Sequence, residues 1–147
     1  YSINKKWVGK DAKKFLSAIG IESDAKLIIC ETEQMHPFVQ TEMMMPILAI
    51  VRVNDIDEAI DMAVRAEHGN RHSAHIHSKN VDRLTAFARA IETTIFVKNA
   101  PSYAGIGAGG EGHTTFTIAG PTGEGLTSAR SFTRQRRCVM ADGLHIV

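Results

Sequence analysis

The sequence is poor in cysteine, in aromatic residues and in net charge, and it has no long apolar run. Only Cys30 and Cys138 occur in 147 residues, which excludes a disulfide framework and favours a reduced, intracellular setting. Aromatic residues at 6% and a formal net charge of +1 argue against a nucleic-acid partner. No apolar run approaches the ~20 residues that cross a bilayer, and the first residues lack the apolar core of a secretory signal.

The remaining composition is that of a soluble globular protein of about one domain, with 44% hydrophobic and 22% charged residues. Strand-like and helix-like segments alternate along it. The apolar patterns predict strands at 26–31, 47–53, 73–78 and 94–98, and helices at 13–19, 56–67 and 81–91. This order predicts an α/β fold, a mostly parallel sheet with flanking helices. A further strand is predicted at 130–140, and a short one at 114–118.

Two of the helices have clear caps and apolar faces. Asn54 or Asp55 is placed to cap the helix at 56–67, and Asn80 the helix at 81–91. The apolar residues of both recur at helical spacing. They are Ile56, Ala59, Ile60, Ala63 and Val64 in the first helix, and Leu84, Phe87, Ala88 and Ile91 in the second. Both cysteines lie in apolar, strand-like segments and are expected to be buried.

An acidic residue, three methionines and a proline lead into the second strand. A carboxylate such as that of Glu42 at a strand mouth can accept two hydrogen bonds from a ribose diol. Thioethers such as that of Met44 can pack against a flat heterocycle. Methionines before a strand also serve as core filler, and the run alone leaves both interpretations open.

A long glycine-rich loop, 99–113, follows the fourth strand. Ordered loops of this length usually have a function. The glycines at 105, 107, 109, 110 and 112 do not make a phosphate-binding fingerprint, because a strand-like segment rather than a helix follows them. They predict a close-approach loop that lines a pocket.

Four stretches together resemble the C-terminal third of a CoA-acylating aldehyde dehydrogenase, of the type found in bacterial propanediol and ethanolamine utilisation. They are residues 36–48, 69–78, 95–101 and 109–117, the last running on through 121–130. The resemblance implies part of an aldehyde dehydrogenase catalytic domain over 1–128 and an oligomerisation strand and tail over 129–147. Because the chain begins at Tyr1, without an initiator methionine, we expect a piece of a longer protein.

The resemblance also implies roles for individual residues. Glu42 falls on the position that binds the nicotinamide ribose, Met44 on the one beside the nicotinamide ring, and Pro46 on the proline that closes this motif. Met44-Met45 stands where the wider superfamily has Phe-Gly, and this replacement is similar to that in the acylating branch. The residues that would line the aldehyde and acyl pocket are His72, Asn99, Ile106, Gly109, Gly110 and His113. Gly107-Ala108 replaces the Pro-Phe of the wider superfamily, so the pocket shape is expected to differ.

The family's chemistry has two steps, in which a cysteine thiolate attacks the aldehyde with hydride transfer to NAD, and coenzyme A then takes up the acyl group from the thioester. Neither Cys30 nor Cys138 matches the nucleophile motif, so no catalytic residue is assigned and the isolated chain is expected to be inactive. The parent is expected to oxidise a short aliphatic aldehyde such as acetaldehyde or propionaldehyde. It is expected to be a cytoplasmic homo-oligomer, a dimer or a tetramer. An N-terminal peptide outside this chain would direct it to the lumen of a bacterial microcompartment.

Two clusters, one of histidines and one of arginines, have other interpretations. His72, His75 and His77 lack the further ligands of a zinc site. Arg130 and its neighbours to Arg137 could meet cofactor phosphates, although a charged edge strand or a subunit interface explains them better. Two alternatives to a catalytic role stay open. The chain could be a non-catalytic structural or oligomerisation fragment, or part of an acylating module fused to an alcohol dehydrogenase.

Overall fold

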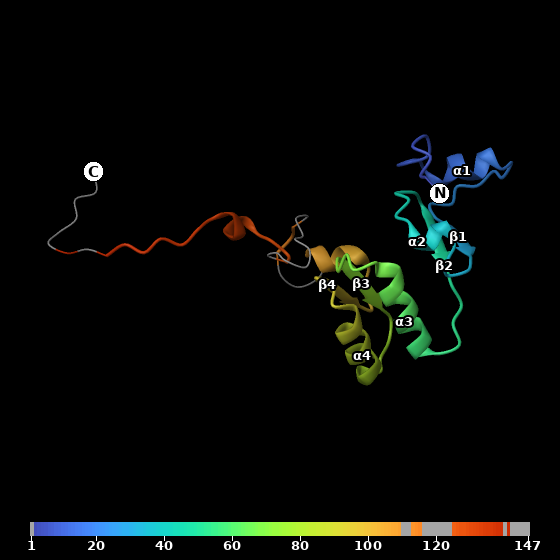
Figure 1. Ribbon diagram of the computed structural model, residues 1–147. Coiled ribbons are helices and arrows are strands. Elements are labelled where there is room, and N and C mark those ends of the chain that lie inside the picture. The colour runs from blue at the N-terminus through green and yellow to red at the C-terminus, as the bar shows by residue number, and fades with distance from the viewer. Residues whose placement is uncertain (1, 110–112, 116–124, 140, 142–147) are drawn as a thin grey trace. The chain divides into compact units, whose positions relative to one another are not determined.

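The computed structural model describes residues 2–109, 113–115, 125–139 and 141. It divides the chain into two compact units, residues 1–69 and 70–147, which are described separately (Figure 1). The division lies elsewhere than the predicted limit at 128 and 129, which stays a prediction. No helix among the described residues is long and apolar enough to span a membrane.

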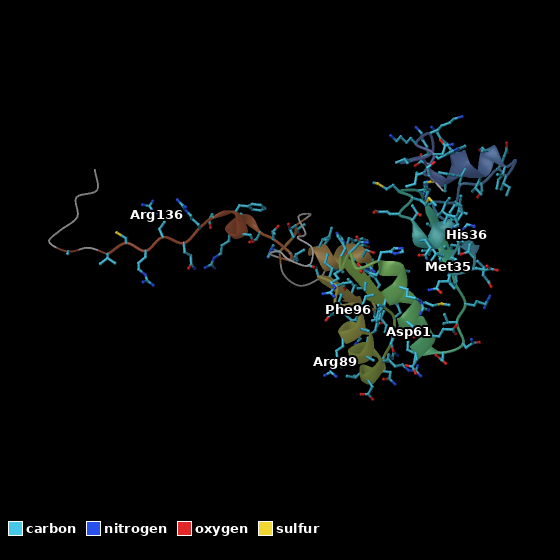
Figure 2. The ribbon with its side chains drawn as sticks, viewed as in Figure 1. Met35, His36, Asp61, Arg89, Phe96 and Arg136 are labelled. Atoms are coloured by element: carbon cyan, nitrogen blue, oxygen red, sulfur yellow. The ribbon has the colours of Figure 1, made fainter. Side chains whose placement is uncertain are left out.

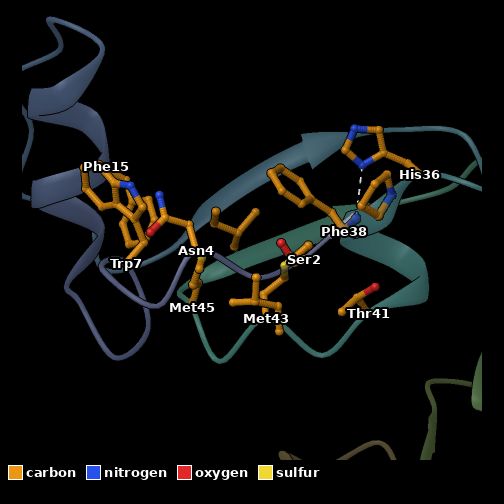
Figure 3. A pocket seen from close by; sticks show the side chains of 12 residues that line it. Ser2, Asn4, Trp7, Phe15, His36, Phe38, Thr41, Met43 and Met45 are labelled. Atoms are coloured by element: carbon orange, nitrogen blue, oxygen red, sulfur yellow. Dashed lines mark hydrogen bonds between the residues drawn. The ribbon is translucent and has the colours of Figure 1, made fainter.

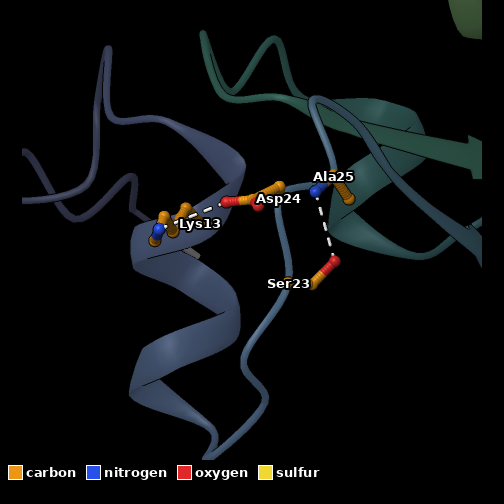
Figure 4. Close-up of polar contacts among 4 residues, drawn as sticks. All are labelled: Lys13, Ser23, Asp24 and Ala25. Carbon is orange, nitrogen blue, oxygen red and sulfur yellow. Dashed lines mark hydrogen bonds and ion pairs between the residues drawn. The ribbon is translucent and has the colours of Figure 1, made fainter.

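The first unit contains a parallel pair of short strands with three helices. Its elements are α1 (Ala12–Ala18), β1 (Ile28–Glu31), α2 (Pro37–Gln40), β2 (Ile47–Ile50) and α3 (Ile56–Glu67). β1 and β2 run parallel with Ile28 opposite Ile47. The connection after α1 is held by the ion pair between Lys13 Nζ and Asp24, at 3.2 Å, and by a turn at Ser23 (Figure 4). Both groups of the ion pair are exposed, so its contribution to stability is small.

The β1–β2 pair carries apolar side chains on both faces but buries none of them. Ile29 is 61% exposed and Leu48 is 49% exposed. Parallel sheets normally have both faces covered. Within the described residues, this pair therefore lacks the cover that its composition calls for.

Helix α3 forms over the predicted range because its ends are capped. The Asp55 carboxylate accepts a hydrogen bond from the Glu58 amide at 2.9 Å, and His68 ends the helix in the left-handed region. Its apolar stripe is half-buried rather than buried. It faces Val39, Val51 and Val53 across a depression of about 230 Å³.

The described part of the second unit is a βαβ crossover followed by two separate short 3₁₀ helices. Its elements are β3 (Ser73–Ile76), α4 (Val81–Ile91), β4 (Ile95–Lys98), η1 (Ser102–Ile106) and η2 (Ala129–Phe132). β3 and β4 are parallel, with Ser73 opposite Ile95. The Asn80 side chain caps α4 by accepting from the Arg83 amide at 3.1 Å, as the sequence predicts.

The core of this unit lies on both faces of β3–β4. On one face, Phe87 of α4 packs on Phe96, with ring centroids 5.6 Å apart. On the other face, η1 lies so close to β4 that a Cβ at Gly105 would overlap the Ile95 side chain and approach Val97 Cγ2 to 2.9 Å. Ile95 and Val97 are consequently buried. The loop after β4 is thus a packed cover of the sheet.

The α/β class with parallel strands is confirmed, and several details of the prediction are wrong. The described strands form two separate pairs. α2 and η1 were not predicted. The expected strand at 130–140 begins instead as η2, because Ser128 and Ser131 form a reciprocal capping box. Residues 134–139 have no strand partner in the part of the chain described, and Cys138, expected to be buried, is exposed. Thr114 and Thr115 are not in a strand, and 116–118 lie outside the described residues.

Candidate functional site

The segment from Glu42 to Pro46 has a left-handed residue at its centre. Met44 has φ 53° and its side chain is 68% exposed. Left-handed backbone is unfavourable for a methionine and needs support from its surroundings. Glu42 is also exposed, and no hydrogen bond or ion pair involves its carboxylate among the described residues. Two of the three predicted cofactor residues, Glu42 and Met44, are therefore open to a ligand.

The neighbours of Met44 point the other way, into an apolar pocket of about 500 Å³ (Figure 3). Met43 and Met45 line it together with Trp7 and Phe15, whose rings lie 4.9 Å apart. The rest of the lining is Ser2, Ile3, Asn4, His36, Pro37, Phe38, Thr41 and Ile47. The sequence left open whether these methionines serve as core filler or as cofactor contacts. The structure divides them, with two in the pocket and one on the surface.

Three backbone hydrogen bonds fix the same segment. The Gly9 amide donates to the Met44 carbonyl at 3.0 Å, the Ile47 amide to the Met45 carbonyl at 2.8 Å, and the Ile28 amide to the Pro46 carbonyl at 2.9 Å. Pro46 is half-buried where β1 and β2 begin. The contact of this segment with the N-terminal turn was not predicted from the sequence. The one feature of the sequence that could have indicated it is Gly9, which has φ 67° in the structure.

In the second unit, Asn99 extends the strand pair beyond β4. Its side-chain oxygen accepts from the Ser78 amide at 2.8 Å, and its amide nitrogen donates to the Ser78 carbonyl at 2.9 Å. Its backbone has φ 52°, a conformation that asparagine tolerates better than most residues. Asn99 therefore sits at the carboxyl end of the parallel strands, where ligands of open α/β sheets bind.

His72 lies at the opposite end of the same strands. Its carbonyl accepts from the Ile95 amide at 3.0 Å, whereas the Asn99 amide donates to Ile76 at the far end. The His72 ring contacts Ser73 Oγ at 2.6 Å. Four strand residues separate the two ends by about 13 Å. The structure does not bring His72 and Asn99 together.

The glycine-rich loop closes on itself around Gly107. The Thr115 amide donates to the Ile106 carbonyl at 3.1 Å, and Gly107 has φ 92°. A Cβ at Gly107 would lie 2.5 Å from the His113 carbonyl oxygen, so only glycine fits. The His113 ring contacts the carbonyl of buried Thr127 at 3.1 Å.

The backbone at Ile106 and the backbone at His113 thereby lie close together, and their place in the aldehyde pocket stays a prediction. Gly109 has φ 74° and open space around its Cβ position. Gly110 lies outside the described residues.

The remaining candidates are dispersed. No group of three or more metal-binding side chains occurs among the described residues. Cys30 is half-buried, with its Sγ 3.8 Å from the Leu48 carbonyl. The arginines from 130 to 137 are exposed, and Figure 2 shows Arg136 extending from the terminal segment.

Parallel strands joined by a helical crossover, followed by a glycine-closed loop, define an α/β domain. The model of the aldehyde dehydrogenase family matches residues 26–133, and the chain belongs to this family.

Two curated relatives match almost the whole chain. The acetylating acetaldehyde dehydrogenase EutE of Salmonella typhimurium is 52% identical over 99% of the chain and 32% of its own length. The CoA-propanoylating propanal dehydrogenase of the same organism is 53% identical over 97% of the chain and 32% of its own length. The chain thus spans about a third of the length of these relatives.

Solved structures give the same picture. The Rhodopseudomonas palustris propionaldehyde dehydrogenase, with bound CoA and an acylated cysteine, is 62% identical with a TM-score of 0.88, over 93% of this chain and 32% of that one. An engineered glycolyl-CoA reductase with bound NADP⁺ matches with the same values. A propionaldehyde dehydrogenase from a Clostridium phytofermentans fucose-utilisation microcompartment is 62% identical over 96% of this chain and 33% of that one, with a TM-score of 0.87.

Proposed function

We propose that this chain is the C-terminal portion of an NAD-dependent, CoA-acylating aldehyde dehydrogenase that oxidises a short aliphatic aldehyde. The overall reaction converts aldehyde, NAD⁺ and coenzyme A to acyl-CoA, NADH and a proton. The observation that carries the proposal is identity of 52% and 53%, over nearly the whole chain, to enzymes named for acetaldehyde and propanal. The first name specifies an acetylating enzyme and the second a CoA-propanoylating one.

Glu42 and Met44 are the residues proposed to bind the dinucleotide. An exposed carboxylate without a partner among the described residues suits a ribose diol, whose two hydroxyl groups can both donate to it. The exposed thioether of Met44 suits the face of the nicotinamide ring. When bound, NAD⁺ supplies the hydride acceptor. The chain's own contribution is to bind and orient it.

Asn99 and the closed loop are proposed to contact the aldehyde and the acyl group. The loop is packed on β4, so Ile106, Gly109 and His113 are presented by a rigid support. Gly110 is included in the proposed site because it follows Gly109 in the sequence. His72 is the weakest member, because it lies at the far end of the strands from Asn99.

The nucleophilic cysteine is assigned to the part of the parent that this chain does not contain. The thiol of Cys30 faces a strand carbonyl, and Cys138 lies in an exposed segment without regular structure. Cys30 lacks the accessible setting that activates a thiolate, and Cys138, although exposed beside Arg137, does not match the family's nucleophile motif. The isolated chain should therefore show no turnover.

We also propose that the parent is a homo-oligomer in which residues 129–147 pair with a neighbouring subunit. Phe132 and Val139 are 73% and 82% exposed, which suits residues that become buried on assembly. A microcompartment is the proposed location, since one matching structure comes from such a compartment. A purely structural role for the chain is the alternative.

The test is CoA-dependent NADH formation from propionaldehyde by the full-length enzyme. Glu42→Gln should raise the KM for NAD while leaving the KM for the aldehyde within twofold. An unchanged KM for NAD would remove Glu42 from the site and favour the structural alternative.

A further inference from the structure

We propose that Trp7 is a positioning residue for the dinucleotide. Through the pocket behind Met44, it holds the Glu42 carboxylate in the direction that the ribose requires. The inference rests on the proposed function, because it assumes that Glu42 and Met44 meet the dinucleotide. It adds a residue from outside the family match, which begins at residue 26.

The first step is the backbone conformation of Met44. At φ 53° a methionine is strained, and the segment would relax if nothing held it. The side chains alternate along this segment, so that Met43 and Met45 both line the pocket while Met44 stays exposed. The direction of Glu42 depends on this arrangement, since it is the residue directly before Met43.

The second step is what supports the strained residue. The Gly9 amide donates to the Met44 carbonyl at 3.0 Å. Gly9 belongs to a tight turn in which the Trp7 amide donates to the Asn4 carbonyl at 3.0 Å and the Lys10 amide to the Trp7 carbonyl at 3.2 Å. The turn therefore places one donor directly on the strained residue.

The third step is the anchor of that turn. The Trp7 ring packs on Phe15 of α1 at 4.9 Å and lines the same pocket as Met43 and Met45 (Figure 3). The ring thus anchors the turn that carries the Gly9 donor and forms part of the pocket wall that the two methionine side chains share. Loss of the ring removes one wall of the pocket, and flexible methionines then repack. Met44 is free to leave the left-handed region, and Glu42 turns with it.

The test uses the full-length enzyme that contains this chain, with KM for NAD and kcat measured separately. Trp7→Ala should raise the KM for NAD about tenfold, with kcat at saturating NAD within about twofold of wild type. A factor of ten corresponds to about 1.4 kcal/mol. Trp7→Phe keeps an aromatic wall and should restore the KM to within about threefold.

Phe96→Ala is the matched control. Phe96 is also a half-buried aromatic residue packed on a second ring, but in the other compact unit. Phe96→Ala should lower the melting temperature about as much as Trp7→Ala does, without raising the KM for NAD. Met43→Ala tests the same pocket wall without touching the N-terminal turn, and should also raise the KM for NAD. It serves in place of Trp7→Ala if that variant does not fold.

The outcomes separate the two proposals. If Glu42→Gln raises the KM for NAD while Trp7→Ala, or Met43→Ala in its place, leaves it within twofold, the positioning role is overturned and the proposed function stands. If Glu42→Gln leaves the KM unchanged, the proposed cofactor site itself fails. An equal rise in Phe96→Ala would show a general effect of destabilisation and would also overturn the positioning role.

Discussion

Replacing Gly107 by alanine should open the loop that follows β4. The new Cβ would lie 2.5 Å from the His113 carbonyl oxygen, 2.7 Å from its carbon and 2.8 Å from Thr114 Cα. All three are backbone atoms, so no side chain can rotate away. The loop itself must shift, and it loses the hydrogen bond from the Thr115 amide to the Ile106 carbonyl.

Gly109→Ala is the matched control for the magnitude. Gly109 has a positive φ of 74°, against 92° for Gly107, but nothing lies within 4 Å of its Cβ position. The strain of a positive φ alone costs roughly 1–2 kcal/mol. Gly107→Ala carries that strain and an overpacking cost of about 1–3 kcal/mol in addition. A difference of about 2 kcal/mol corresponds to roughly 30-fold in the opening equilibrium.

The assay is hydrogen exchange of the peptide that contains the Thr115 amide, measured in the full-length enzyme. We expect roughly 30-fold faster exchange in Gly107→Ala than in Gly109→Ala. The KM for the aldehyde should rise in the same variant, if the loop lines its pocket. Equal exchange in the two variants would refute the close approach at Gly107 as the cause of loop closure.

Three further substitutions test other contacts. Asp55→Ala removes the N-cap of α3 and should lower the free energy of unfolding by about 1 kcal/mol, measured by thermal melting. Asp57→Ala, which removes no capping contact, should lower it less, and equal losses in the two variants would contradict the capping role of Asp55. Asn99→Ala should lower stability by about 1 kcal/mol, since it removes two exposed hydrogen bonds to the Ser78 backbone, and an unchanged melting temperature counts against this. Glu42→Gln should raise the KM for NAD about tenfold or more, because a hydrogen bond to a charged acceptor contributes about 1.5–3 kcal/mol. The control Glu33→Gln, at another exposed glutamate, should leave the KM for NAD unchanged. Similar KM values for the two variants would exclude a specific ribose contact of Glu42.

Local sequence determined α3 and α4 and the alternation of strands and helices around them. Asp55 and Asn80 cap α3 and α4 at the predicted positions, because capping depends on a side chain and an amide three residues away. The βαβ crossover from β3 to β4 followed from the same local patterns. The glycine-rich loop was recognised as a close-approach loop because glycine is required where backbones meet.

Tertiary structure decided where the side chains of the candidate site point. Met43, Met44 and Met45 are chemically alike, so the sequence does not decide which of them face the pocket, and the folded segment places Met43 and Met45 there and Met44 on the surface. His72 and Asn99 are equally plausible as sequence candidates, yet they lie at opposite ends of one strand pair. Their separation arises because strand pairing fixes the register between residues distant in the chain. The sequence by itself thus determined which residues could act, and non-local packing and hydrogen bonding decided which of them meet.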